Sequence, residues 1–197
     1  MRGGQFGAVI MASFALASCT SEPRDAFVGA PRQSGVSAVS SDVRGIRKVA
    51  TFDADVLVLS RRNYYGWAGD DFAAYSPTDI AVAWGEGARS EVHSRIKISQ
   101  SGRFYFWRAG AEAWKDPRVR RFGKHSANWH LIPANDTVAG AIDDISENQV
   151  VGLKGYLVDI NAPDGGRWRT SRTRGDQGAG ACEIILVTEV RPDAGTA

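Results

Sequence analysis

One cysteine near the C-terminal end, Cys182, has the chemistry of a nucleophile or a redox thiol. A catalytic thiolate needs a basic neighbour that lowers its pKa and a polar group that orients that base. The segment from His125 to His130 carries both residue types, with either histidine as the base and Asn128 as the orienting amide. Cys182 also opens an apolar run, where an unpaired cysteine commonly packs as a small hydrophobe. A buried structural thiol is therefore the favoured interpretation, and a Cys–His hydrolase or transferase is the alternative.

The two histidines are not expected to bind a metal ion. His125 and His130 differ by an odd number of positions, so on a strand their side chains point to opposite faces. Neither has a cysteine or carboxylate nearby at the spacing of zinc ligands. We expect one histidine to hydrogen-bond a backbone carbonyl in the core and the other to be exposed, with no metal and no cofactor.

A second group of chemically capable side chains surrounds the glycine-rich segment 175–180. Arg172 and Arg174 carry guanidinium groups, which bind carboxylates or phosphates through paired hydrogen bonds, and the glycines allow close backbone approach. The alternative is a solvated loop whose arginines pair with Asp176 at the surface. An enzyme that uses Arg172, Asp176 and Glu183 is a weaker alternative. The residues of this candidate ligand site are Trp168, Arg169, Arg172, Arg174 and Asp176.

The N-terminal segment has the pattern of a bacterial export signal. Arg2 provides a positive start, residues 6–17 carry no charge, and Leu16-Ala17-Ser18-Cys19 follows. This apolar run is too short to span a bilayer comfortably as a helix. The pattern resembles the lipobox of bacterial lipoproteins, in which the peptidase cuts before the cysteine and the thiol is lipidated. The alternative is an ordinary signal peptide with a chance cysteine.

Lipidation of Cys19 implies a protein of the bacterial cell envelope that is anchored to the membrane by its lipid and faces the periplasm. Thr20 follows the cysteine, and no aspartate is present there to retain the protein at the inner membrane. The outer membrane is therefore the favoured location. Cys182 is then left without an intramolecular disulfide partner.

The chain divides into four parts by composition. Residues 1–18 are the signal peptide, and residues 19–45 are rich in Ser, Ala, Gly and Pro without apolar periodicity, as in a flexible tether. Residues 46–191 are expected to form a single domain, and residues 192–197 a disordered tail. With 24 Lys and Arg against 22 Asp and Glu, the net charge is close to zero and does not favour nucleic acid as a partner.

A local basic run, Arg118 to Lys124, lies near Trp114 and Trp129 in the sequence. Arginines interleaved with aromatic side chains suit phosphate and stacking contacts. Because an envelope protein rarely meets nucleic acid, the expected partners are an anionic glycan, a lipid headgroup or an acidic protein surface. The alternative is a solvated loop. The sequence therefore favours a non-catalytic envelope lipoprotein that binds an envelope protein or an anionic ligand, with the oligomeric state left open.

The elements that must position these residues are mostly strands. Apolar and polar residues alternate in Ala50–Val56, and Ile96–Trp107 has the pattern of a hairpin. Val150–Ile160 is a β-branched run in which Gly152 and Gly155 suggest a bulge or a sharp coil. Further strands are expected at 168–171 and at 182–190, and the second of these is apolar on both faces and so expected to be central.

An amphipathic helix is predicted at about 135–147, because Asn135 can cap it and Val138, Ile142 and Ile145 lie on one face. A weaker helical turn is predicted at 77–83. Five to six strands with one helix before the last three predict a mainly β (α+β) fold. The expected architecture is a small, partly open β-barrel similar to the oligonucleotide/oligosaccharide-binding (OB) barrel, in which a helix lies between the third and fourth strands.

Several segments resemble a family of uncharacterised bacterial exported proteins and lipoproteins. They are Ile98–Arg108 (ISQSGRFYFWR), His125–Ala134 (HSANWHLIPA), Gly155–Val158 (GYLV) and Gly180–Glu183 (GACE). The similarity covers most of residues 47–190. The resemblance implies a single exported domain and brings no activity with it.

Overall fold

The structure is a computed structural model that describes residues 29–36, 42, 44–64, 70–173, 181–192 and 194. The predicted signal peptide, Cys19, Arg174, Asp176 and most of the predicted tail lie outside the described residues. Within the described part, no helix is long and apolar enough to cross a membrane.

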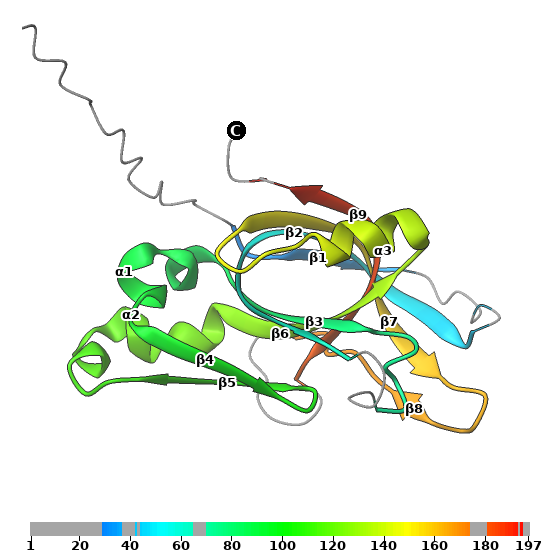
Figure 1. The fold of residues 1–197 in the computed structure, drawn as a ribbon, viewed down its shortest axis with the longest axis horizontal. Coiled ribbons are helices and arrows are strands. Elements are labelled where there is room, and N and C mark those ends of the chain that lie inside the picture. Colours follow the sequence, from blue (N-terminus) through cyan, green and yellow to red (C-terminus); the bar gives the residue numbers. More distant parts are fainter. Residues whose placement is uncertain are drawn as a thin grey trace, which may run out of the picture.

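Strands dominate the described residues, so the prediction of a mainly β fold is confirmed (Figure 1). The strands are β1 Arg32–Gly35, β2 Ile46–Asn63, β3 Thr78–Ala83, β4 Ile96–Ser101, β5 Phe104–Ala109, β6 Ser126–Pro133, β7 Val150–Asn161, β8 Arg167–Trp168 and β9 Glu183–Pro192. The helical elements are short: α1 Ser90–His93, α2 Pro117–Arg120, α3 Asp136–Asp143, and the 3-10 turns η2 Gly85–Ala88, η3 Ala113–Lys115 and η4 Phe122–Lys124.

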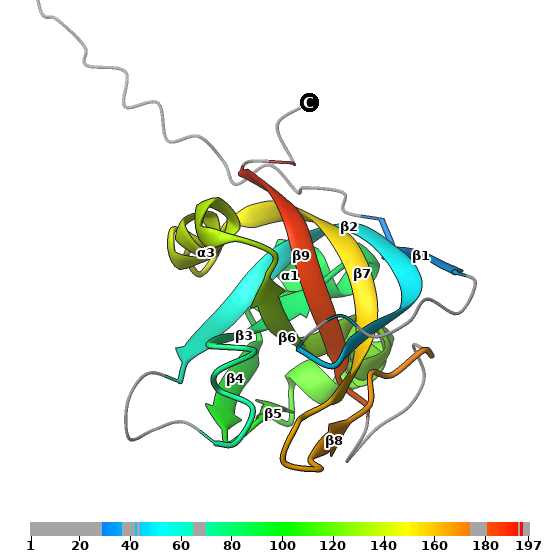
Figure 2. The same ribbon diagram turned by 90° about the vertical axis from the view of Figure 1, so that its right-hand side faces the viewer.

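The main sheet is a ring of strands. Its strand order is β1-β2-β3-β6-β9-β7-β8, and an additional pairing of β2 with β7 joins β2, β3, β6, β9 and β7 into a closed circuit. The pairing of β6 with β9 is parallel, whereas the other pairings in the circuit are antiparallel. Figure 2 shows β9 running beside β7 on one side of the ring. The ring leaves β1 and β8 as its outer strands.

The apolar residues of the ring form two packed groups. The larger group contains Phe52, Trp129 and Leu131. The aromatic side chain of Phe52 meets that of Trp129 edge-on, with 5.0 Å between the centroids. In β9, Ile185 and Val187 belong to this group, whereas Ile184 and Leu186 belong to the second one. The prediction that β9 is apolar on both faces and central is therefore confirmed.

Helix α3 agrees with the predicted amphipathic helix and is shorter at its C-terminal end. The side chain of Asn135 accepts a hydrogen bond from the backbone N–H of Val138 at 3.0 Å, as expected of an N-cap. Val138 and Ile142 are buried against the larger apolar group. The helix ends at Asp143, and Asn148 adopts a positive φ of 66° before β7 begins.

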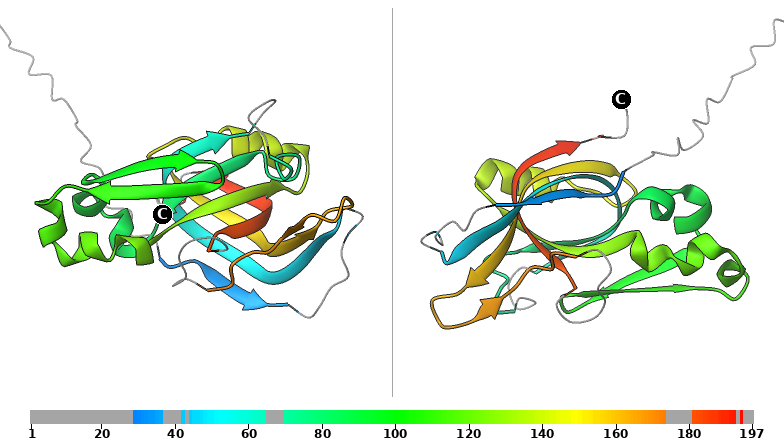
Figure 3. Two further views of the ribbon diagram at one scale, coloured as in Figure 1. Left: turned by 90° about the horizontal axis from the view of Figure 1, so that it is seen from below. Right: turned by 180° about the vertical axis from the view of Figure 1, so that it is seen from behind.

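The predicted hairpin is present as a separate two-stranded sheet of β4 and β5. Gly102, with a φ of +56°, allows the tight turn between the strands. Figure 3 shows that the hairpin lies alongside β6, outside the ring. It therefore covers part of the outer face of the ring.

The weaker helical turn predicted at 77–83 is wrong, because this segment is strand β3. All six residues of β3 are buried, since one face meets the larger apolar group and the other lies under the hairpin. Burial on both faces removes the alternation that distinguishes a half-exposed strand. Of the predicted strand at 168–171, only Trp168 is in a strand, as the second residue of β8.

The ordered domain extends further toward the N-terminus than the predicted boundary at residue 46. Arg32–Gly35 forms β1, which pairs antiparallel with β2 and places Arg32 opposite Asp53. The two side chains form an ion pair at 3.0 Å. A short polar strand at a sheet edge gains its order from this pairing and not from apolar periodicity, so composition alone assigns it to the tether.

We expect deletion of residues 20–36 to lower the stability by about 1–2 kcal/mol, because it removes the hydrogen bonds of β1 and the ion pair of Arg32. The matching change in melting temperature is a few degrees. Deletion of residues 20–28 alone should leave the melting temperature unchanged, because β1 is retained. Differential scanning calorimetry of the two deletions measures this, and identical melting temperatures would contradict it.

Candidate functional site

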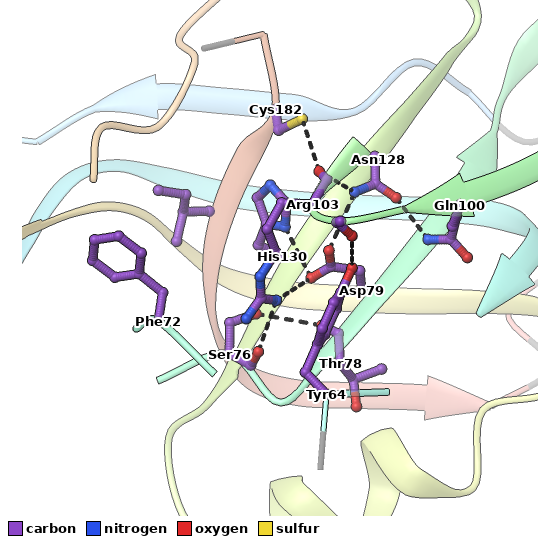
Figure 4. A network of polar contacts seen from close by, with 12 residues as sticks. Tyr64, Phe72, Ser76, Thr78, Asp79, Gln100, Arg103, Asn128, His130 and Cys182 are labelled. Atoms are coloured by element: carbon purple, nitrogen blue, oxygen red, sulfur yellow. Dashed lines mark hydrogen bonds and ion pairs between the residues drawn. The ribbon is translucent and has the colours of Figure 1, made fainter. Parts of the chain in front are cut away.

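A layer of buried polar side chains lies between the ring and the hairpin (Figure 4). The register of β3 and β6 places Asp79 opposite His130 and Ala81 opposite Asn128. Because side chains alternate along a strand, these residues lie on the face opposite that of Ile80 and Trp129. Asp79, Asn128 and His130 are each at most 1% exposed. The hairpin and its turn supply their partners.

Arg103, the residue after Gly102 in the hairpin turn, is the centre of this layer. Its Nη1 donates to Oδ1 of Asp79 and to the backbone oxygen of Ser76, both at 2.9 Å. Its Nε and Nη2 donate to the two carboxylate oxygens of Asp70, each at 2.8 Å. Its guanidinium also lies over the ring of Tyr64, 3.7 Å from the centroid. One arginine thus joins two carboxylates, a loop carbonyl and an aromatic face.

The ionisation of these groups follows from their contacts. Burial alone would lower the pKa of Arg103, but the hydrogen bond to Asp70 and the charge of Asp79 outweigh it, and the pKa is raised. The hydrogen bonds from Arg103 hold the pKa of Asp70 below its usual value. Burial, together with the nearby Asp79 carboxylate, raises the pKa of Tyr64, whose hydroxyl donates to the backbone oxygen of Gly102. Arg103 and Asp70 are therefore charged, and Tyr64 is neutral.

The two histidines lie in different environments. His130 is buried, with its ring 4.5 Å from that of Trp168 and its Nδ1 2.8 Å from Oδ1 of Asp79. His125 precedes β6 and is half-buried, with its Nε2 3.8 Å from a carboxylate oxygen of Glu86. A buried histidine was expected, but its partner is a carboxylate and not a backbone carbonyl.

Beside the polar layer is a pocket of about 290 Å³. One wall is β5, and the other consists of the start of β6 and the residues before β9. The hydroxyls of Tyr105 and Ser126 lie 2.9 Å apart within it, and burial raises the pKa of Tyr105. The lining residues are Trp84, Phe104, Tyr105, Phe106, Trp107, Gly123, Ser126, Ala127, Asn128, Thr173, Ala181, Cys182 and Glu183.

The structure brings Cys182 together with Asn128 at this pocket. Nδ2 of Asn128 donates to the backbone oxygen of Arg103 at 3.1 Å, and Sγ of Cys182 lies 3.9 Å from the same oxygen. A carbonyl oxygen cannot take up the thiol proton, so this contact does not activate the sulfur as a nucleophile. The carboxamide of Asn128 is also bound by Gln100 at 2.8 Å. Asn128 therefore connects the hairpin to β6.

The arginines of the predicted anion site bind the chain itself. Arg169 donates to the backbone oxygen of Ile160 at 3.0 Å and to Oδ1 of Asn161 at 2.8 Å. Arg172 lies 3.4 Å from a carboxylate oxygen of Asp159, which is buried and also pairs with Arg47 at 2.5 Å. Trp168 packs on His130 and on Phe72. The Arg172 side chain is 58% exposed, so the anion site stays a prediction.

The basic run from Arg118 to Lys124 is also largely used within the fold. It forms α2 and η4 and not an extended loop. Asp116, the N-cap of α2, pairs with Arg118 at 2.8 Å, and Glu86 pairs with Arg121 at 2.9 Å. Arg120 donates to the backbone oxygens of Trp114 and Lys115. Lys124 is exposed at the end of the run.

Asp79, Arg103 and Tyr64 were not found from the sequence. Asp79 lies in the segment that was misassigned as helical, and Arg103 follows the turn glycine of a hairpin, where a surface position is expected. The one signal in the sequence is that Asp79 and Arg103 carry opposite charges. Many exposed residues that form no contact also do so. Among the described residues, no three His, Cys, Asp or Glu side chains gather where they could hold a metal ion.

Comparison with known proteins adds no assignment. No protein-family model, no curated protein and no solved structure matches the chain.

Proposed function

We propose that the chain is a lipid-anchored, non-catalytic binding domain of the bacterial cell envelope, and that it holds its ligand in the pocket between β5 and β6. The observation that carries this proposal is the composition of the pocket. Aromatic side chains line it together with hydrogen-bonding groups from Ser126 and Asn128, a combination typical of ligand sites. By contrast, the guanidinium groups of Arg169 and Arg172 already contact other groups of the chain at its surface.

The arrangement of the ring supports an OB-like assignment. Taking β2, β3, β6, β7 and β9 as the first to fifth strands, the helix α3 follows the third, and the third pairs parallel with the fifth. OB barrels bind oligonucleotides and oligosaccharides on the face of the second and third strands and on the loop between the fourth and fifth. The pocket uses the third strand, β6, and residues of that loop. The hairpin is an insertion between the second and third strands.

We expect a substitution that fills the pocket to abolish ligand binding. Ala181 lines the pocket, so Ala181→Trp should weaken any bound compound at least tenfold. Ala134→Trp, an exposed position at the far end of β6, is the matched control. The experiment is a ligand-observed NMR screen of neutral saccharides, phosphorylated and sulfated glycans and short peptides, with circular dichroism to verify that each variant is folded.

The same compounds should bind the double variant Arg169→Ala, Arg172→Ala as they bind the unaltered chain. Compounds that are lost in the arginine variant and retained by Ala181→Trp would place the site at the arginines and contradict the proposal.

The anchor has its own test. Cys19→Ala should leave the precursor uncleaved and should abolish incorporation of radioactive palmitate, because the thiol is the acceptor of the lipid. Membrane fractionation of the unaltered protein then distinguishes the outer from the inner membrane. Palmitate incorporation by the Cys19→Ala protein would exclude the lipobox interpretation.

A further inference from the structure

Among the described strands, β5 has one unpaired edge, and its residues line the pocket. Ser101 and Phe104 flank the two-residue turn of the hairpin and face each other, so they form a hydrogen-bonded pair. Because hydrogen-bonding direction alternates along a strand, Phe104 and Phe106 bond to β4, and the backbone groups of Tyr105 and Trp107 point to the other edge. In the described part of the chain, β5 pairs with no strand but β4.

Within the described residues, this edge lacks three of the usual protections against pairing. Proteins shield exposed edges with charged side chains, prolines or bulges. The sequence Phe104-Tyr105-Phe106-Trp107 has none of these, and β4 and β5 pair in unbroken register. Phe104 and Phe106 are 44% and 55% exposed, two of the three large apolar side chains that are exposed in the described residues. An unprotected aromatic edge is a template for an added strand.

The opposite wall limits what can add there. It consists of Ser126–Asn128, at the start of β6, and residues 181–183. Strand β9 pairs with β6 from Trp129 onward, so the first residues of β6 lie beyond that pairing. A single strand beside β5 occupies about 4.8 Å. If the strand were β5 of a second copy, its partner β4 would have to occupy the next position, on the side of this wall. A single extended segment therefore needs less room between β5 and the wall than a symmetric dimer of hairpins does.

The charge at one end of the pocket favours acidic residues in that segment. Arg108 follows Trp107, Lys97 lies opposite Arg108 in the hairpin, and Lys124 follows Gly123 in the pocket wall. These three basic side chains are exposed and form no ion pair with any described residue.

We infer that the ligand is an extended peptide segment of another protein, which adds to β5 as a strand and carries acidic residues at the end near Arg108 and Lys124. This inference rests on the proposed function, because it names the ligand class of the same pocket. Backbone hydrogen bonds to Tyr105 and Trp107 would provide affinity, and the exposed phenylalanines would pack against alternate side chains of the peptide.

The test selects peptides from a displayed library of random decapeptides on the immobilised full chain, with the Ala181→Trp chain as the negative selection. Enriched decapeptides are then synthesised, and their affinities are measured by fluorescence anisotropy. We expect acidic residues to be enriched toward one end. Every second backbone nitrogen of a decapeptide is then methylated, in two versions (phases) that differ in which alternating set carries the methyl groups. In one of the two phases the affinity should fall at least tenfold, because methylation removes strand pairing while it keeps every side chain.

Charge reversal tests the second half of the inference. The double variant Arg108→Glu, Lys124→Glu should bind the same decapeptides about tenfold more weakly. The control Lys154→Glu, Arg167→Glu, at exposed positions of β7 and β8, should bind them unchanged.

Decapeptides that bind equally well after methylation in both phases would overturn strand addition. So would a selection that enriches no peptide over Ala181→Trp. If saccharides or other small compounds still bind the pocket in that case, the proposed function stands and the peptide inference alone fails. If nothing binds the pocket, both fail. A concentration-dependent dimer in analytical ultracentrifugation that a selected decapeptide dissociates would assign the edge to a second copy and would also overturn the inference.

Discussion

Arg103→Met should destabilise the domain more than loss of any exposed ion pair, by about 3–5 kcal/mol. The substitution keeps much of the side-chain volume but leaves Asp79, which is 0% exposed, without its cationic partner. It also frees the hairpin turn from the loop that carries Asp70 and Ser76. For a domain of this size, each kcal/mol of lost stability lowers the melting temperature by about 2–4 °C, so the melting temperature should fall by about 10 °C. Urea denaturation followed by tryptophan fluorescence measures the change.

Two variants give this prediction its controls. Arg32→Met removes an ion pair whose arginine side chain is 77% exposed, so it should cost under about 1 kcal/mol. Asp79→Asn introduced into Arg103→Met removes the uncompensated charge and should restore about 1–3 kcal/mol of the loss. If Arg103→Met and Arg32→Met have equal costs, the buried layer does not hold the hairpin.

Gly155→Ala should lower the stability by about 3 kcal/mol, at the upper end of the usual cost of overpacking. A Cβ at this position would lie 2.0 Å from the backbone oxygen of Leu186 and 3.1 Å from Cα of Val187. Backbone atoms of a central strand cannot move aside without breaking the pairing of β7 with β9. The register of that pairing shifts between Lys154 and Gly155, where Thr188 of β9 is the extra residue, so the irregularity lies beside Gly155 but the inserted residue is not in β7 as predicted.

Gly152→Ala, in the same strand, is the matched control. There the added Cβ would meet the ends of two side chains, Arg191 and Asp55, at 2.6–2.8 Å. Because side-chain ends can rotate away, the expected cost is about 1 kcal/mol. Chemical denaturation of the two variants compares them directly, and equal costs would contradict the proposed role of the close approach at Gly155.

These two predictions concern the two interactions that build the site. The close approach at Gly155 allows β7 to pair with β9, which is one of the pairings of the ring, and the ring holds β3 and β6 side by side. Arg103 then holds the hairpin against that pair, and the pocket lies along the edge of β5. Loss of either interaction should therefore alter the pocket as well as the stability.

The sequence alone was enough to predict the elements that have a local signature. Alternation in Ala50–Val56 indicated β2, the alternating residues 96–98 followed by Gly102 and an aromatic run indicated the hairpin, and the cap at Asn135 indicated α3. Each of these signals arises within a few residues, because burial on one face imposes a period of about 2 on a strand and of about 3.6 on a helix. An irregularity near Gly155 was also indicated, since glycine within a strand commonly marks a bulge, although the extra residue is in β9.

Only the tertiary structure determined β1, β3 and the site. Strand β1 has no apolar pattern and depends on pairing with β2, and β3 lost its alternation because the hairpin covers its second face. The contact of Arg103 with Asp79 joins residues 24 positions apart, and Cys182 meets the backbone of Arg103 from 79 positions away. No local periodicity reports such contacts. Some charged and polar residues that the sequence presents as available for a ligand therefore bind other groups of the chain instead. They do so because a buried charge requires a partner.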